Sequence, residues 1–117
     1  MSPKRGDRVA APPVGEEWDI RFTDSDSARG WADLCRQVPA NTREAFEAIR
    51  TNPRPFPHAE RQHRLHGDHA VREFRGREVE QWQYEVTGAG RIWYLVDEAK
   101  HVVWVTWAGT GHPKKTE

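Results

Sequence analysis

The densest group of side chains that can do chemistry lies in the middle of the chain. Between residues 50 and 77, seven arginines stand against three acidic residues, and four of the six histidines follow one another: His58, His63, His66 and His69. Imidazole is a common zinc ligand, but no cysteine or carboxylate set at ligand spacing accompanies these histidines. The sequence therefore predicts no metal site and no cofactor. The excess of basic groups also suits phosphate binding, although on charge alone a solvated loop is the simpler interpretation.

Other chemistries find little support in the sequence. The single cysteine, Cys35, lies on the apolar stripe of an expected helix and is interpreted as a packing residue. Phosphate-binding glycine loops, nucleophile elbows and HExxH motifs are absent from the 117 residues. No apolar run is long enough to span a membrane, and one cysteine excludes an internal disulfide framework. We therefore expect one cytoplasmic domain with no membrane partner.

The elements that must position any site begin after a polar segment. Residues 1–17 hold three prolines and two glycines and are expected to form a disordered or loosely attached N-terminal arm. Residues 18–22 alternate apolar and polar side chains, which predicts a short strand. Apolar residues at helical spacing predict a helix over 28–38 that ends at Pro39. A second helix is expected to start with Asn41 as N-cap and Glu44 reaching back, and to stop at Asn52. A connection of about three residues makes the two helices an antiparallel hairpin.

The remaining residues predict strands. A short strand is suggested at 71–74, and three clearer ones follow at 79–86, 91–96 and 102–107, separated by short turns. Such connections favour an antiparallel meander, and the strand at 18–22 must join its sheet to satisfy its backbone. The order predicts an α+β fold over residues 18–117, with the helices on one face of a three- to four-stranded sheet. Trp31, Trp93 and Trp104 are predicted to be core residues.

Three local sequences, in order, resemble the RelE/ParE superfamily of toxins from bacterial type II toxin–antitoxin pairs. Arg64-Leu65-His66-Gly67 is similar to a Leu-x-Gly step before the family's strands. Residues 91–97, which read RIWYLVD, are similar to its central strand, and residues 111–116, which read GHPKKT, resemble the ending of a RelE-like subgroup. The resemblance covers roughly residues 18–117.

The resemblance implies a cytosolic toxin that a cognate antitoxin neutralises. RelE-like members cut mRNA in the ribosomal A site without a metal, so the ribosome and mRNA would be further partners. ParE-like members instead inhibit DNA gyrase, and a third possibility is a non-toxic relative that only binds its antitoxin. Fold alone cannot choose among these functions. The leading interpretation is an mRNA endoribonuclease in which the ribose 2′-OH attacks the adjacent phosphate.

By resemblance, four residues would carry this catalysis: His112, Arg91, Arg64 and Glu85. His112 suits proton transfer because imidazole titrates near neutral pH. Arg91 would hold a phosphate, or else pair with Glu85 across the hairpin. Glu85 would act as a base. We expect His112, Arg91 and Arg64 to converge on one concave face.

A second set of residues would bind RNA: Arg61, His63, His66, Gln83, Lys114 and Lys115. RNA binding rests on attraction between these cations and the RNA backbone. The alternative for the first three is a solvated loop without function, and the alternative for the two lysines is a frayed terminus. Gln83 marks a departure, because many relatives carry a cation in this strand and an amide cannot stabilise a phosphorane as a cation would.

Overall fold

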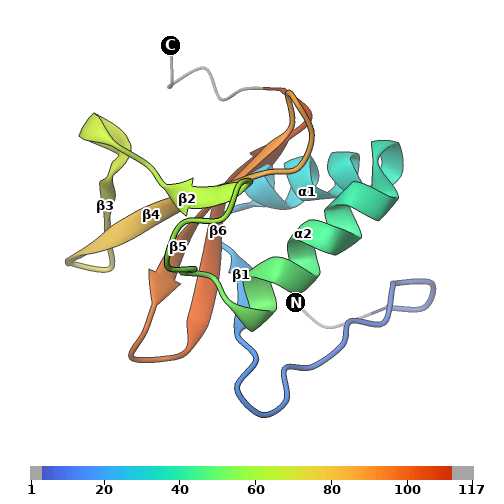
Figure 1. Ribbon diagram of the computed structural model, residues 1–117. Coiled ribbons are helices and arrows are strands. Elements are labelled where there is room, and N and C mark those ends of the chain that lie inside the picture. Colours follow the sequence, from blue (N-terminus) through green and yellow to red (C-terminus); the bar gives the residue numbers. More distant parts are fainter. Residues whose placement is uncertain (1–3, 112–117) are drawn as a thin grey trace.

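The computed structural model describes residues 4–111. Two helices lie together on one side of a twisted sheet (Figure 1). The elements follow in the order β1 (Asp19–Phe22), α1 (Ser25–Gln37), α2 (Pro39–Thr51), β2 (Gln62–Arg64), the 3₁₀ turn η1 (Gly67–His69), β3 (Val71–Phe74), β4 (Arg77–Glu85), β5 (Arg91–Asp97) and β6 (Val102–Gly109). The predicted α+β class, with a strand, a helical pair and then strands, is confirmed.

The sheet has the strand order β1-β6-β5-β4-β2, and β3 pairs with the other half of β4. Strands β4, β5 and β6 form the predicted antiparallel meander. Strand β1 joins the sheet as expected, and it lies parallel to β6. Strand β2, which sequence patterns did not predict, pairs antiparallel with β4. The described sheet is therefore larger than the predicted one, and mixed.

The start of the second helix corrects a prediction. Helix α1 begins at Ser25, three residues before the predicted start, and its N-cap is Asp24, whose carboxylate accepts a hydrogen bond from the Ser27 backbone N–H at 2.8 Å. Helix α2, however, begins at Pro39, directly after Val38, rather than at Asn41. Proline is well suited to the first helical position, where its missing N–H has no partner to lose. Asn41 is not a cap; its side chain donates to the Val86 carbonyl oxygen at 3.3 Å.

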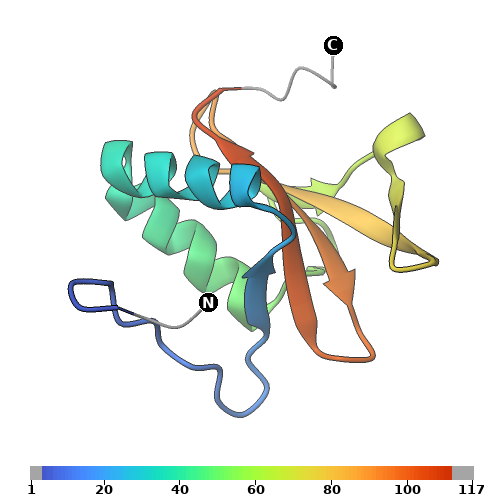
Figure 2. The ribbon, with the colours of Figure 1, turned by 180° about the vertical axis from the view of Figure 1, so that it is seen from behind.

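The main core lies between the helices and the sheet. Helix α1 packs against β6 (Figure 2) at Gly30, where an added Cβ would come within 1.7 Å of the Ala108 carbonyl oxygen. Only glycine permits so close an approach of a helix to a strand. Buried residues of the two helices meet those of the three central strands, and the members include Leu34, Ala45, Ile49, Trp82, Tyr94, Val96, Val103 and Val105.

A smaller cluster fills the opposite side of the sheet. Val79, Leu95, Val102 and Trp104 are buried there, with Phe74 packed against them. The β3–β4 turn has positive φ at both Arg75 and Gly76, as a type I′ turn requires. This turn directs the Arg75 guanidinium over the Trp104 ring, at 4.7 Å from its centroid.

The tryptophan predictions have a mixed outcome. Trp93 and Trp104 are buried as predicted, but both lie outside the helix-side core. Trp31 is half-buried and only borders that core. None of the helices among residues 4–111 is long and apolar enough to cross a membrane.

Candidate functional site

Strand alternation divides the polar residues of the sheet between its two faces. Residues paired directly across neighbouring strands point to the same side. Trp82 is paired with Tyr94, and both belong to the helix-side core. Gln83 is paired with Trp93 and therefore lies on the other side. We call this side, at His63, Gln83, Glu85 and Trp93, the open face.

An imidazole and a carboxylate meet on the open face. His63 Nε2 lies 3.2 Å from Glu85 Oε2, and the two side chains are 28% and 34% exposed. His63 Nδ1 lies 3.3 Å from the Arg64 carbonyl oxygen, so both ring nitrogens have an acceptor beside them. Such a ring can donate to both acceptors only when it carries two protons. The imidazole and the carboxylate thus lie within hydrogen-bonding distance, and both side chains are partly open to solvent.

Arg61 brings a cation to this pair. Its backbone carbonyl accepts from the Glu85 N–H at 2.7 Å, and its Nη1 donates to the Glu85 carbonyl oxygen at 3.0 Å. The Arg61 side chain is otherwise exposed. The geometry lets its guanidinium attract an anion that approaches the His63–Glu85 pair.

Two glutamines complete the open face. Trp93 Nε1 donates to Gln83 Oε1 at 2.8 Å. The Gln81 side chain is buried, where it accepts from Thr106 Oγ1 at 2.8 Å and donates to the His69 carbonyl oxygen at 3.1 Å. Gln81 thus serves structure, while Gln83 is half-buried and lies nearer solvent.

Arg91 lies beside Glu85 but has a structural task. It is paired in register with Glu85 and is only 8% exposed. Its Nη1 donates to the carbonyl oxygens of Thr87, Gly88 and Gly90 at 2.9 to 3.2 Å. The guanidinium therefore holds the β4–β5 turn together, and we find no ion pair between Arg91 and Glu85 among residues 4–111.

Arg64 does not join the open face. It is paired with Trp82, so strand alternation directs it to the helix side. There its Nη2 donates to the Ala70 carbonyl oxygen at 3.0 Å, and its Nη1 lies 3.9 Å from Glu80. Its Nε is buried without a partner among the described residues. The expected convergence of Arg64 with Arg91 is thus absent, because β2 places adjacent residues on opposite faces.

The remaining predicted site residues lie either next to η1 or outside residues 4–111. His66 is exposed immediately before η1. His112, Lys114 and Lys115 lie outside the described residues. Strand β6 ends at Gly109, which is paired with Arg91.

Sequence reasoning singled out His63 and Glu85 separately and did not foresee their pairing. The signal was weak, because β2 is only three residues long and shows no alternation. Trp93 was expected only as a packing residue. Its pairing with Gln83 follows from the register of β4 and β5. The strand patterns indicate this register only when the length of the turn between the two strands is known.

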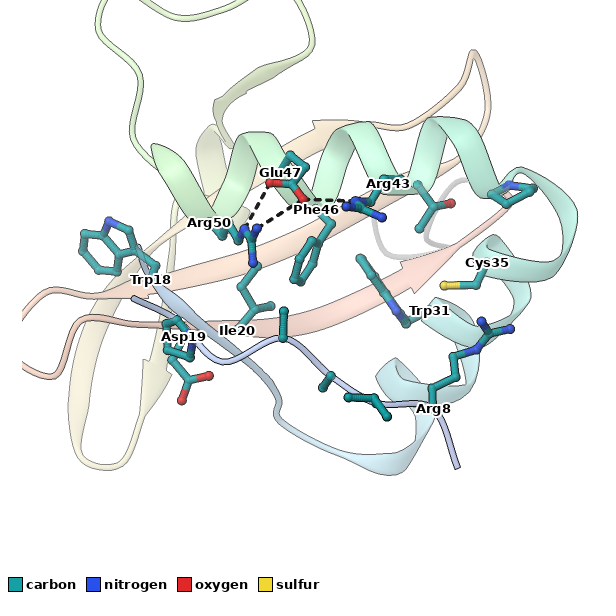
Figure 3. A pocket seen from close by; sticks show the side chains of 16 residues that line it. Arg8, Trp18, Asp19, Ile20, Trp31, Cys35, Arg43, Phe46, Glu47 and Arg50 are labelled. Carbon is teal, nitrogen blue, oxygen red and sulfur yellow. Dashed lines mark hydrogen bonds and ion pairs between the residues drawn. The ribbon is translucent and has the colours of Figure 1, made fainter. Parts of the chain in front are cut away.

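The helix side carries a groove of about 550 Å³ (Figure 3). Its lining includes Trp31 and Phe46, and residues 8–11 and Pro13 of the N-terminal segment form part of its wall. Glu47 lies between Arg43 and Arg50, and the hydrogen bond from Arg43 lowers the pKa of its carboxyl.

This groove is poorly equipped for catalysis. Burial raises the pKa of the Cys35 thiol, which makes the thiolate nucleophile scarce. Among residues 4–111, no three histidine, cysteine or acidic side chains are grouped to hold a metal ion. The open face, where an imidazole and a carboxylate meet partly exposed, is therefore the better candidate site.

Comparison with known proteins gives no match to a family model and none to a curated protein sequence. Solved structures do match. The YoeB dimer from Staphylococcus aureus has a TM-score of 0.57 at 10% identity, over 82% of this chain and 99% of that one. A metal-bound toxin from Helicobacter pylori has a TM-score of 0.56 at 9% identity, over 80% and 93%.

The archaeal RelE–RelB complex from Pyrococcus horikoshii matches as well, with a TM-score of 0.54 at 12% identity, over 80% of this chain and 94% of that one. Each of the three matches extends over at least 80% of this chain with a TM-score above 0.5. This chain therefore has the fold of the RelE- and YoeB-type toxins.

Proposed function

We propose that the protein is the toxin of a toxin–antitoxin pair and cleaves mRNA on the ribosome, in the cytoplasm, without a metal. The RelE- and YoeB-type fold supports the toxin role. The single observation that carries the nuclease activity is the His63–Glu85 contact on the open face. Transesterification of RNA needs a group that takes a proton and a group that returns one.

In the proposed reaction, Glu85 takes the proton of the ribose 2′-OH as that oxygen attacks the adjacent phosphate. The 5′ oxygen leaves with a proton that His112 donates, and a cyclic phosphate remains. His63 holds the Glu85 carboxylate in place through their 3.2 Å contact. His112 lies outside the described residues, and its role in this proposal rests on the chemistry of imidazole.

Cations would hold the phosphate. Arg61 lies exposed beside Glu85, and in this proposal its guanidinium attracts the RNA backbone. His66, Lys114 and Lys115 add backbone contacts. Arg91 contributes by holding the turn next to Glu85. The arrangement does not use Arg64, whose catalytic role stays a prediction.

The proposed partners are the ribosome, mRNA and a cognate antitoxin. A site with few groups of its own benefits when ribosomal RNA fixes the geometry of the message. One matched structure is a complex of RelE with RelB, which supports an antitoxin partner for this chain.

The test is a reconstituted translation reaction in which the ends of the message are mapped by primer extension. We expect cleavage that requires ribosomes, and a fall of about 10²–10⁴-fold when Glu85→Gln or His112→Ala removes a proton-transfer group. Glu78→Gln, in an exposed position on the same strand, serves as the control and should cleave normally. An intact message with the unmodified protein would refute the nuclease.

A non-enzymatic inhibitor of a protein target such as gyrase is the second candidate. Two observations favour it: Arg91 Nη1 is engaged by three carbonyls, and β4 places only glutamine and glutamate beside His63 on the open face. Inhibition of gyrase supercoiling by both the unmodified protein and the Glu85→Gln variant would support it. A protein that neither cleaves message nor arrests growth would be the non-toxic relative.

A further inference from the structure

The open face must supply hydrogen-bond donors to any phosphate that reaches the His63–Glu85 pair. On β4 the residue next to this pair is Gln83, whose register partner on β2 is His63. A glutamine side chain has one acceptor end and one donor end. Whether it repels or binds a phosphate oxygen depends on which end faces outward.

Trp93 decides this orientation. The indole N–H is a donor and cannot accept, so the atom that it contacts at 2.8 Å must be the oxygen of the Gln83 amide. A flipped amide would place two donors against each other. The Gln83 nitrogen, with its two N–H groups, therefore points away from Trp93.

The indole itself is held firmly. Trp93 is 4% exposed, it is paired with Gln83 on one side and Trp107 on the other, and its ring lies 5.0 Å from that of His69. A donor whose orientation is fixed before substrate arrives needs no reorganisation during the reaction. The neutral amide of Gln83 can then donate hydrogen bonds to a phosphate at a position where many relatives carry a cation.

We propose that Trp93 is a positioning residue that fixes Gln83 as a two-donor ligand for a phosphate oxygen of RNA at the His63–Glu85 pair. The inference rests on the proposed function for its substrate. It adds Trp93, which acts only by orienting Gln83, and it makes the uncharged Gln83 amide a ligand of the phosphate. A neutral ligand also releases no counterion, so this contact should leave the salt dependence of binding unchanged.

The first test is a double-mutant cycle on single-turnover cleavage of ribosome-bound message. Gln83→Glu keeps an acceptor for the indole but removes both donors, and it should slow cleavage about 100-fold. Trp93→Phe keeps an aromatic ring and removes the N–H, and it should slow cleavage about tenfold. In the Gln83→Glu background, Trp93→Phe should have no further effect, because no donor is left to orient.

Controls separate positioning from packing. Trp107→Phe makes the same ring change on the neighbouring strand and should leave the rate unchanged. Gln83→Lys should restore cleavage to the Trp93→Phe protein, because an ammonium donates in every orientation. Additive effects of Gln83→Glu and Trp93→Phe, or failure of this rescue, would overturn the inference.

A binding measurement keeps the inference testable apart from cleavage. The side-chain NH₂ resonances of Gln83 are followed in ¹⁵N-labelled protein while an oligoribonucleotide with 2′-O-methyl groups, which cannot be cleaved, is added. We expect these resonances to shift in the unmodified protein and to shift clearly less in Trp93→Phe. A shift without any message cleavage would refute the nuclease and keep the donor role, whereas no shift would overturn the donor role itself.

Discussion

The two faces of the sheet use their polar groups in opposite ways. On the helix side, the Tyr94 hydroxyl donates to the Pro53 carbonyl oxygen at 2.8 Å and accepts from Gln62 Nε2 at 2.9 Å, so its hydrogen bonds connect parts of the fold. On the open face, His63 and Glu85 face each other with about a third of each side chain exposed. The comparison predicts that the helix side contributes mainly to stability, whereas in our proposal the His63–Glu85 region of the open face supplies the chemistry.

Substitutions on the helix side should therefore lower the free energy of unfolding. Gly30→Ala would place a Cβ within 1.7 Å of the Ala108 carbonyl oxygen, and a backbone atom cannot move aside as a flexible side chain can. We expect a loss of more than about 3 kcal/mol in the free energy of unfolding, measured by urea denaturation. Gly88→Ala has open space around its added Cβ and is the control.

Unchanged stability in Gly30→Ala would mean that α1 does not lie against β6 as described. The proposed difference between a stabilising helix side and a reactive open face would then lose its main structural evidence.

Changes on the open face should instead separate activity from stability. Glu85→Gln should abolish most of the cleavage while changing the free energy of unfolding by less than about 0.5 kcal/mol, the range typical of surface substitutions. Thermal and urea unfolding of the purified variant measure this. A loss of several kcal/mol would show that the His63–Glu85 pair is a structural contact, and the comparison of faces would fail.

The Tyr94 hydroxyl offers a finer test of the helix side. Tyr94→Phe leaves the Pro53 carbonyl oxygen without its donor, and we expect a loss of about 1–3 kcal/mol. Tyr84→Phe is the control, because the structure gives the Tyr84 hydroxyl no hydrogen-bond partner among residues 4–111. Equal losses from both variants would contradict the importance of this bond.

Alkaline pH should act through the same residue. Burial raises the pKa of Tyr94 well above its usual value of 10.0, so the unfolded chain releases this proton first. Stability is therefore retained below about pH 10 and lost above it, by about 1.4 kcal/mol per pH unit. Urea unfolding between pH 9 and 11 should show a shallower decline in Tyr94→Phe than in the unmodified protein.

The smallest expected effect belongs to the cap of α1. The backbone hydrogen bond from Ser27 lowers the pKa of Asp24 below its usual 3.8. The stabilisation is thus present above about pH 4 and lost as the pH falls below it. Asp24→Ala should cost about 1 kcal/mol at pH 7 and less at pH 3, where urea unfolding of the two proteins should converge.

The sequence predicts the strongly patterned parts of this fold well. The central strands β5 and β6 are recognisable from continuous apolar runs, and Gly76 marks the β3–β4 turn. Pro39 predicts the end of one helix, and in the structure it also begins the next. Local patterns cannot separate these two roles.

The site was predicted less completely, for a related reason. A three-residue strand has too few positions to reveal which face each side chain takes, so Arg64 was expected beside Arg91. The pairing with β4 decides its face, and pairing is a non-local property. The family resemblance suggests separate roles for His63 and Glu85, whereas their contact depends on the pairing of β2 with β4.

The parallel pairing of β1 with β6 has a consequence for how the molecule forms. Thr23 bonds to Val105 across 82 residues of chain, so the edge of the sheet closes only after β6 has been made and has folded. Contacts between such distant segments slow folding. During synthesis, β1 and the strand surface that α1 packs against must wait for residues 102–109, and a nascent chain that lacks them can pair only β2, β3, β4 and β5. Any activity that depends on the complete sheet would therefore be absent until residues 102–109 have been made and have paired with β1 and β5.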